Sequence, residues 1–203
     1  MTEPPAIPEL QTPRLLLRRL VEADALGLHA VYGDPLAMRF WDLLPSRDVA
    51  ETTARIRRSI EISSEWHAAF AVRLRDDGEF VGMVNYHRRV PLYRKLAVGW
   101  ILAPRWWRHG FAEESTRALL DHCFTALDAH RIEAHIETDN QPSLRLAERL
   151  GFRREGLMRD CLFVDGKPRT AFLCCLAAPG LGEPGISIKP QSRRKPGPTN
   201  QGR

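Results

Sequence analysis

The sequence predicts an α+β fold, an α/β/α sandwich in which helices flank a twisted, mixed and mainly antiparallel sheet. Three consecutive apolar runs within residues 67–102 predict antiparallel strands. Residues 98–115 then predict a strand, a basic and aromatic loop and the start of a helix. A last hairpin within residues 161–176 adds two strands near the end of the chain.

The composition is that of a globular protein with one sizeable core. The chain has 203 residues, of which 43% are hydrophobic and 27% charged. We expect a single domain over residues 10–178, an N-terminal extension at 1–9 and a tail at 179–203. No apolar run approaches the ~18 residues that cross a bilayer, and residues 1–8 are acidic and rich in proline, unlike a secretory signal. The sequence therefore predicts a cytoplasmic protein without a membrane partner.

The tail at 179–203 carries four of the five net positive charges, because five basic residues stand against Glu183. It also holds five of the fifteen prolines and five of the fourteen glycines, with too few apolar residues to order itself. A disordered or partner-dependent tail is expected, and an arm that binds nucleic acid or the ribosome is the alternative. The nearly neutral domain has no general affinity for polyanions.

The first third of the chain predicts one strand and two helices. The strand lies at residues 15–20, and the first helix, at 21–32, is expected to face Leu26 and Ala30 inward. Ser46 is the expected N-cap of the second helix. That helix is expected to bury Val49, Thr53, Ile56 and Ile60 and to expose a solvated face of Arg55, Arg57, Arg58 and Glu61.

The middle and end of the chain predict a sheet interrupted by two helices. Strands at 67–74, 80–86 and 96–102 lead into a helix that begins near Ala112 and buries Leu119, Cys123 and Leu127. His122 lies near this apolar face and is interpreted as a core histidine. Residues 131–137 alternate as a strand, and Pro142 suits the first turn of the helix that follows. The final hairpin turns at Asp165-Gly166, and Pro168 restricts the start of its second strand to an edge.

The cysteines predict neither a disulfide framework nor a metal site. No C-x-x-C pair occurs among the four, and two of them are adjacent on a predicted strand, where they point to opposite faces. We interpret all four as buried thiols: Cys123, Cys161, Cys174 and Cys175.

The loop before the predicted helix at Ala112 is a candidate anion site. The first turn of a helix has backbone N–H groups without internal partners and the positive end of the helix dipole. Gly110 allows the backbone to come close to an anion, and Arg105, Arg108 and His109 add positive charge. An ordinary strand-to-helix connection, in which the glycine serves only the turn, explains these residues equally well.

A second motif, Asp139 to Ser143 followed by a helix and Gly151-Phe152, decides between these readings. Asn140, Ser143, Glu148, Gly151 and Phe152 match N-x-x-S…E-x-x-G-F, and Trp107 to Ala112 partly match R/Q-x-x-G-x-G/A, with Trp107 and Arg108 departing from it. Together with Thr12 to Arg18, these motifs resemble the GNAT superfamily of acyl-CoA-dependent N-acyltransferases, most closely its RimJ/RimL-like branch.

The resemblance implies a GNAT fold with a central splay in the sheet and acetyl-CoA as cosubstrate. The loop would wrap the pyrophosphate, and the pantetheine arm would pair with exposed strand backbone before it. The residues that this implies for acetyl-CoA binding are Ile101, Leu102, Trp107, Arg108, His109, Gly110, Phe111, Ala112, Glu113, Asn140 and Ser143.

The implied reaction is acetyl transfer to a primary amine by direct attack in a ternary complex. By resemblance, Asn140 holds the pantetheine arm and Ser143 supplies a proton to the leaving thiolate, although helix capping also explains both residues. Relatives often carry a glutamate where this chain has Ala97. The general base therefore stays open between Asp160, His87, Glu137 acting through water, and no residue at all.

The acceptor is expected to be a protein N-terminal α-amine or a small-molecule amine. Phe40, Trp41 and His87 are the candidates for its pocket, with core packing or a homodimer contact as the alternative for the two aromatic residues. A GNAT-like module that binds coenzyme A or a partner with little turnover is the second hypothesis for the whole protein.

Overall fold

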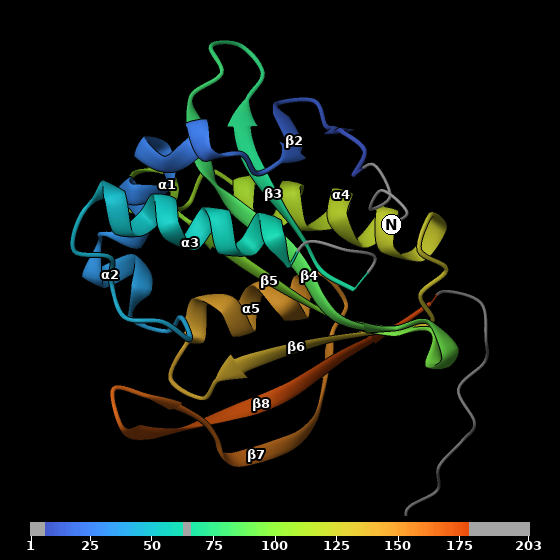
Figure 1. The fold of residues 1–203 in the computed structure, drawn as a ribbon. Coiled ribbons are helices and arrows are strands. Elements are labelled where there is room, and N and C mark those ends of the chain that lie inside the picture. The colour runs from blue at the N-terminus through green and yellow to red at the C-terminus, as the bar shows by residue number, and fades with distance from the viewer. Residues whose placement is uncertain (1–6, 63–65, 179–203) are drawn as a thin grey trace, which may run out of the picture.

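The computed structural model describes residues 7–62 and 66–178, which form one eight-stranded sheet with helices on both faces (Figure 1). The predicted tail and most of the N-terminal extension lie outside the described residues. The strands are β1 (Leu10–Gln11), β2 (Leu15–Arg19), β3 (Ala68–Leu74), β4 (Phe80–Val90), β5 (Lys95–Leu102), β6 (Arg131–Glu137), β7 (Arg153–Val164) and β8 (Lys167–Ala177). The helices are α1 (Ala25–Tyr32), α2 (Pro35–Met38), α3 (Val49–Glu61), α4 (Phe111–Thr125) and α5 (Gln141–Arg149), with short 3₁₀ turns η1 (Glu22–Asp24), η2 (Pro91–Tyr93) and η3 (Pro104–Trp106).

The sheet has the order β1-β2-β3-β4-β5-β6-β8-β7. Every neighbouring pair is antiparallel except β5 and β6, which run parallel. The mixed, mainly antiparallel sheet that the sequence predicts is therefore confirmed.

Two hydrophobic clusters, one on each face of the sheet, hold the helices in place. On one face, Leu119 of α4 and Leu144 of α5 pack against sheet residues such as Phe70. On the other face, Leu28 of α1 and Ile56 of α3 pack in the second cluster. Figure 1 shows α1, α2 and α3 gathered on the face opposite α4. Alternate residues of each strand thus contact different helices, as strand geometry requires.

The parallel pair β5 and β6 is short, and this opens the middle of the sheet. Only Lys95 to Ala97 of β5 pair with Arg131 to Glu133 of β6. Beyond this point β5 continues to pair with β4 as far as Leu102, and β6 pairs with β8 as far as Glu137. The peptide groups of residues 98–102 on the β6 side therefore lack a strand partner. The expected central splay is confirmed, and it is the feature that positions the site.

Two expectations for the first helices are wrong. Leu26 is 75% exposed and Ala30 is also exposed, because α1 begins only at Ala25, after the η1 turn, and buries Leu28 and Val31 instead. The N-cap of α3 is Asp48, whose Oδ1 accepts a hydrogen bond from the Glu51 N–H at 2.7 Å. Ser46 is instead buried two residues earlier in the chain.

One cysteine is placed differently from expectation, whereas the start of β8 at Pro168 lies at an edge, as expected. Cys161 is exposed, which corrects the prediction that all four thiols are buried. β8 is an inner strand rather than an edge strand, but its pairing with β6 begins only at Ala171. Pro168 therefore lies on a part of β8 that needs no hydrogen-bond donor toward β6.

Candidate active site

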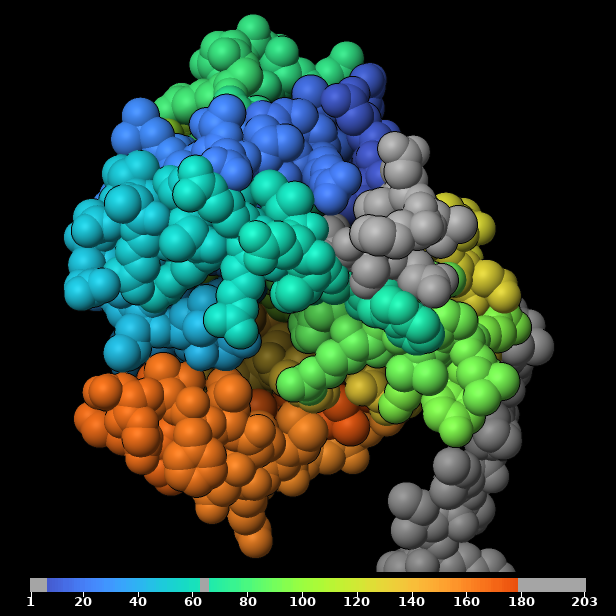
Figure 2. Space-filling model, in the orientation of Figure 1, coloured from blue at the N-terminus to red at the C-terminus, as the bar shows by residue number. Residues whose placement is uncertain are grey.

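A cavity of about 980 Å³ lies at the splay and is lined from both faces of the sheet. Residues of β4 and α3 line one part, and α5 with the adjoining part of β5 lines the other. Figure 2 shows the surface hollowed between the cyan segments around α3 and the orange hairpin of β7 and β8. The cavity therefore connects the acceptor side expected under α3 with the unpaired edge of β5.

The start of α5 fixes Ser143 at this cavity through two hydrogen bonds. The Asn140 side chain caps the helix, because its Oδ1 accepts from the Ser143 backbone N–H at 3.2 Å. The Trp100 indole Nε1–H donates to Ser143 Oγ at 3.3 Å and so bridges β5 and α5. Ser143 can still donate its hydroxyl proton into the cavity.

The start of α4 presents unpaired backbone N–H groups at the other end of β5. Gly110, the N-cap, has φ of +82°, and Arg108 has φ of +66°, so both lie in the left-handed region. Arg14 supports the loop by donating from Nη1 to the His109 carbonyl at 3.0 Å and by stacking 4.6 Å from the centre of the Phe111 ring. This fifteen-residue helix gives the N-terminal dipole that favours an anion.

The structure brings six of the predicted site residues to one cavity: Phe40, Trp41, His87, Glu137, Asn140 and Ser143. Ile101 and Leu102 are buried in β5, which leads from the cavity to α4. The predicted loop residues Trp107, Arg108, His109, Gly110, Phe111, Ala112 and Glu113 form a separate group at the start of α4 and do not line the cavity.

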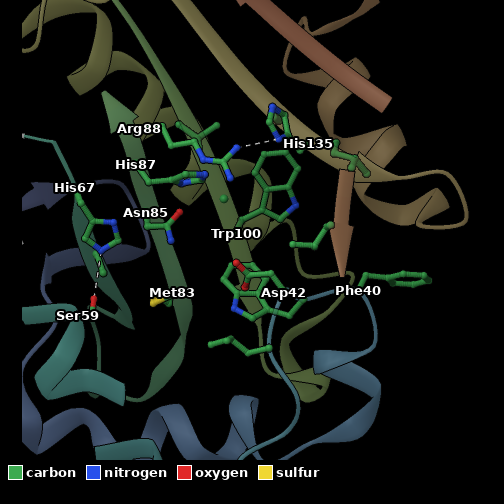
Figure 3. Close-up of a pocket in the computed structure, with 18 of the residues that line it drawn as sticks. Phe40, Asp42, Ser59, His67, Met83, Asn85, His87, Arg88, Trp100 and His135 are labelled. Carbon is green, nitrogen blue, oxygen red and sulfur yellow. Dashed lines mark hydrogen bonds between the residues drawn. The ribbon is translucent and has the colours of Figure 1, made fainter. Parts of the chain in front are cut away.

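Asp160, Glu113 and Phe40 are three predicted site residues that lie outside the cavity lining, pair elsewhere or lie at the edge of the cavity. Asp160 is exposed on β7 with φ of +49° and does not line the cavity, although Met158 and Cys161 on the same strand do. Glu113 pairs with Arg117 and Arg149, each at 2.9 Å. Figure 3 shows Phe40 at the edge of the pocket, turned away from Trp100.

Three histidines line the acceptor side of the cavity and are neutral near pH 7. Burial, with help from the Arg88 charge, lowers the pKa of His87 to about 4. Burial and Arg88 also lower the pKa of His135, and burial lowers the pKa of His67. Figure 3 shows His87 between Asn85 and Arg88, with His135 opposite. These side chains offer hydrogen-bonding nitrogens, and none is a strong base.

The remaining carboxylate of interest, Glu137, is already engaged. Arg169 Nη1 lies 2.9 Å from one carboxylate oxygen of Glu137 and 3.0 Å from the other, and it also donates to the Arg39 carbonyl at 3.1 Å. This contact ties β6 and β8 to the loop after α2 and closes that side of the cavity.

The sequence model of the acetyltransferase (GNAT) domain matches residues 14–153. The chain belongs to the GNAT family. It is an acetyl-CoA-dependent N-acetyltransferase, and its sheet, splay and cavity are those of a GNAT enzyme. Among the residues that the structure describes, no helix is long and apolar enough to span a membrane, and no cluster of His, Cys, Asp or Glu is arranged to hold a metal ion.

Two relatives and one solved structure illustrate the range of this GNAT enzyme's similarities. It is 29% identical over 162 residues to the uncharacterized N-acetyltransferase YoaA of Bacillus subtilis, covering 79% of this chain and 92% of the relative. It is 28% identical over 178 residues to the ribosomal protein uS5 alanine N-acetyltransferase of Escherichia coli, covering 84% and 91%. The spermidine N-acetyltransferase of Vibrio cholerae, solved with CoA and spermine, aligns with a TM-score of 0.71 at 23% identity, covering 82% of this chain and 96% of that one. The last likeness shows the fold alone.

The residues of this GNAT enzyme fit acetyl-CoA. The α4 N-terminus offers N–H groups for the pyrophosphate beside a glycine whose missing side chain leaves room, and residues 98–102 offer unpaired peptide groups for the pantetheine arm. A β-carbon built on Gly110 would lie 3.3 Å from Arg14 Nη2, so the loop has little space for a larger residue.

The cavity residues that sequence reasoning missed include Asn85, Arg88, Trp100 and His135. Asn85, Trp100 and His135 lie on predicted strands, and Arg88 lies two residues beyond the predicted end of β4, but which strand lines the cavity depends on long-range pairing. The β4 alternation of Met83, Asn85 and His87 carries a signal, because polar residues that follow an apolar one on the same side of a strand mark a wet part of a buried face.

Proposed function

We propose that this enzyme acetylates an α-amine, at a protein N-terminus or on a small amino compound, by direct attack in a ternary complex. The observation that carries the proposal is the cavity at the splay, which joins the unpaired edge of β5 to an acceptor pocket. Among the described residues its carboxylates are Glu137, which pairs with Arg169, and Asp42. The uS5 alanine N-acetyltransferase similarity supports a protein N-terminus, and the fold likeness to a spermidine enzyme keeps small amines in view.

The reaction needs a neutral amine, a polarised thioester and a proton for the departing sulfur. The amine nitrogen attacks the carbonyl carbon, a C–N bond forms, the C–S bond breaks, and the proton lost by the amine is balanced by the one gained by the thiolate. Ser143 is the proposed donor of that proton. Its Oγ already accepts from Trp100, which directs the hydroxyl hydrogen away from the indole.

The lack of a strong base favours an amine that is neutral by itself. Ala97 carries no acid, Glu137 is engaged by Arg169, and His87 binds a proton weakly, so Asp42 is the remaining carboxylate of the described lining. At pH 7.5 an α-amine with an ordinary pKa of ~7.7 to 8.0 is roughly 30% neutral, whereas a lysine side chain at ~10.4 is only about 0.1% neutral. The resulting difference of more than a hundredfold in attacking species supports the α-amine.

Amine-dependent release of free thiol from acetyl-CoA tests this proposal. We expect release with short peptides that have a free N-terminus, and much slower release with the same peptides when the N-terminus is blocked and a lysine is present. Binding of acetyl-CoA without amine-dependent release would favour the second hypothesis, a binding module with little turnover.

A further inference from the structure

The cavity is lined by more guanidinium groups than carboxylates. Its charged lining residues are Arg55, Arg58, Arg88 and Arg169 against Asp42 and Glu137. Arg169 pairs with Glu137, and Arg55 pairs with Glu51 at 2.8 Å and also donates to the Leu44 carbonyl. Within the described part of the chain, Arg58 and Arg88 have no carboxylate partner, so the positive charge of this site is not cancelled.

Arg88 lies where the sheet opens. It has φ of +51°, at the irregularity in β4 between His87 and Val90, and its Nη1 is 3.5 Å from His135 Nδ1 on β6 (Figure 3). The guanidinium therefore reaches from β4 across β5 toward β6. Arg88 is an exposed residue of the cavity lining, and its charge adds to burial in lowering the pKa values of His87 and His135.

The phosphates of acetyl-CoA do not account for this charge. Their expected site is at Gly110, beyond the end of β5 at Leu102, whereas Arg88 lies beside the β4 residue that pairs with Ala97. Five residues of β5 separate Ala97 from Leu102, which corresponds to roughly 17 Å along the strand. The donor pyrophosphate is therefore not the expected partner of Arg88 and Arg58, both of which are exposed to solvent at the cavity.

The same pocket contains hydrogen-bonding atoms suited to an amine. Asn85 Oδ1 and His87 Nδ1 are buried and have no hydrogen-bond partner among the described residues. Asn85 pairs with Gly99 on β5, and a β-carbon built on Gly99 would lie only 2.8 Å from Asn85 Oδ1. The amide oxygen thus lies directly over the strand whose edge is expected to hold the donor. A buried acceptor of this kind is costly unless a substrate N–H satisfies it.

We infer that the acceptor carries an anionic group close to its amine, so that Asn85 accepts from the amine while Arg88 and Arg58 bind the anion. This inference rests on the proposed function and narrows its acceptor. The shared chemistry is a carboxylate next to a primary amine, supplied either by an acidic side chain near a peptide N-terminus or by the carboxylate of a free amino acid. A polyamine would instead place a second cation against Arg88.

Matched acceptors that differ in one charge test this inference. The peptide amides Ala-Glu-NH₂ and Ala-Gln-NH₂ share the same N-terminal residue, free alanine represents the second source, and spermidine supplies the cationic case. We expect kcat/KM for the glutamate peptide to exceed that for the glutamine peptide by roughly tenfold or more, with spermidine slowest. Free alanine is expected to lie below the glutamate peptide, because its own carboxylate makes its ammonium group harder to deprotonate than a peptide N-terminus.

Variants of Arg88 and Arg58, each with a matched control, test which residues give the preference for an anionic acceptor. Arg88→Gln should abolish most of the preference for the anionic acceptor, and Arg88→Lys should restore part of it. Arg94→Gln is the matched control, because Arg94 also has positive φ (+48°) but pairs with Asp128 and does not line the cavity. Arg58→Gln should reduce the preference, whereas Arg57→Gln, one residue away and paired with Glu22, should not.

The possible results distinguish failure of the anionic acceptor from failure of the proposed α-amine acetylation. Acetylation of the glutamate and glutamine peptides at equal rates would overturn the anionic acceptor and leave the α-amine enzyme standing. Acetylation of spermidine faster than that of every α-amine would overturn both proposals. Failure of every amine to stimulate thiol release would reject the proposed function and this inference with it. A preference for the anionic acceptor that survives in Arg88→Gln and Arg58→Gln would reject the assigned residues.

Discussion

Gly110 is the residue at which the loop before α4 tolerates least change. Its φ of +82° disfavours any branched side chain, and Arg14 lies close to the space that a side chain would enter. Gly110→Val should therefore weaken acetyl-CoA binding by at least roughly tenfold while the fold is kept, because it displaces the N–H groups that face the pyrophosphate. Calorimetric titration with acetyl-CoA measures this, with circular dichroism as the check on folding.

Gly78 provides the control for backbone strain alone. It has φ of +73° in the turn before β4, and nothing lies within 4 Å of a β-carbon built there. Gly78→Val should lower stability without changing acetyl-CoA affinity. Unchanged affinity in Gly110→Val would remove the pyrophosphate from this loop.

Ser143 offers a clean separation of helix capping from catalysis. Asn140 caps α5 through the backbone N–H of residue 143, which Ser143→Ala retains. We therefore expect nearly unchanged stability and a fall in kcat of roughly 10²-fold with little change in KM, as for loss of a general acid. Ser143→Thr keeps the hydroxyl and should recover part of the rate. Equal kcat for wild type and Ser143→Ala in steady-state assays would show that the Ser143 hydroxyl serves only as the acceptor for the Trp100 indole.

At the scale of residues, the sequence predicts those positions whose role is local. Gly110, Asn140 and Ser143 stand at helix starts, where neighbouring residues determine the geometry, and the structure places them at helix starts. Asn85 and Arg88 escape prediction because their importance comes from β5 and β6, which diverge beside them. No short sequence window contains that information.

At the scale of elements, the η1 turn is held by one buried carboxylate. Asp24 is fully buried, and Arg18 and Arg73 each donate to its Oδ1 at 2.7 Å, which ties the turn to β2 and β3. Burial acts to raise the pKa of Asp24, but these hydrogen bonds outweigh it and leave the pKa below its usual value. The stabilisation is therefore present above the unfolded-state pKa of ~3.9 and is lost as the pH falls through the folded-state pKa.

Asp24→Asn should accordingly lower the free energy of unfolding by about 3 kcal/mol at pH 7, because two guanidinium groups lose their buried partner. The difference from wild type should shrink as the pH is lowered below ~4. Urea unfolding at pH 7 and pH 3 measures both values. Glu22→Gln, which removes an exposed carboxylate from the same turn, should change stability far less. A difference for Asp24→Asn that is independent of pH would contradict this account.

The sequence predicts the bounds of helices and strands closely, but it predicts less well which face of a helix is buried. β6 is predicted with its observed bounds, and α4 begins one residue before the predicted start. The inward face of α1 is predicted wrongly because the first residues of the predicted helix form the 3₁₀ turn η1. The α-helix that follows therefore buries other residues than a helix begun at Val21 would bury. Arg55 and Arg58, predicted to lie on a solvated face, line the cavity because α3 packs across the sheet at the splay.

At the scale of the molecule, the residues after Ala178 are expected to be dispensable for fold and chemistry. Residues 179–203 contain only Leu181, Ile186 and Ile188 as sizeable apolar side chains, too few to stabilise a packed unit. Truncation after Ala178 should leave the melting temperature within about 2 °C of wild type and the acetyl-transfer rate unchanged. A loss of many degrees in a thermal scan would mean that the tail packs on the domain or on a second subunit, and would move the domain boundary.

The overall fold class could be predicted because strands and helices succeed one another with clear patterns and turns. Local patterns could not predict the cavity, which only the family resemblance implied through the central splay, because it exists only where the parallel contact of β5 and β6 ends after three residues. Strand order, with β8 between β6 and β7, likewise depends on which edges meet after collapse of the chain.

Direct transfer of an acetyl group to an α-amine at the splay can be tested by competition within one peptide. The peptide carries a free N-terminus, a glutamate as its second residue, and a lysine. After incubation with acetyl-CoA and enzyme, tandem mass spectrometry locates the acetyl group. The account predicts acetylation at the N-terminal nitrogen with the lysine unmodified, and acetylation mainly at the lysine would contradict it.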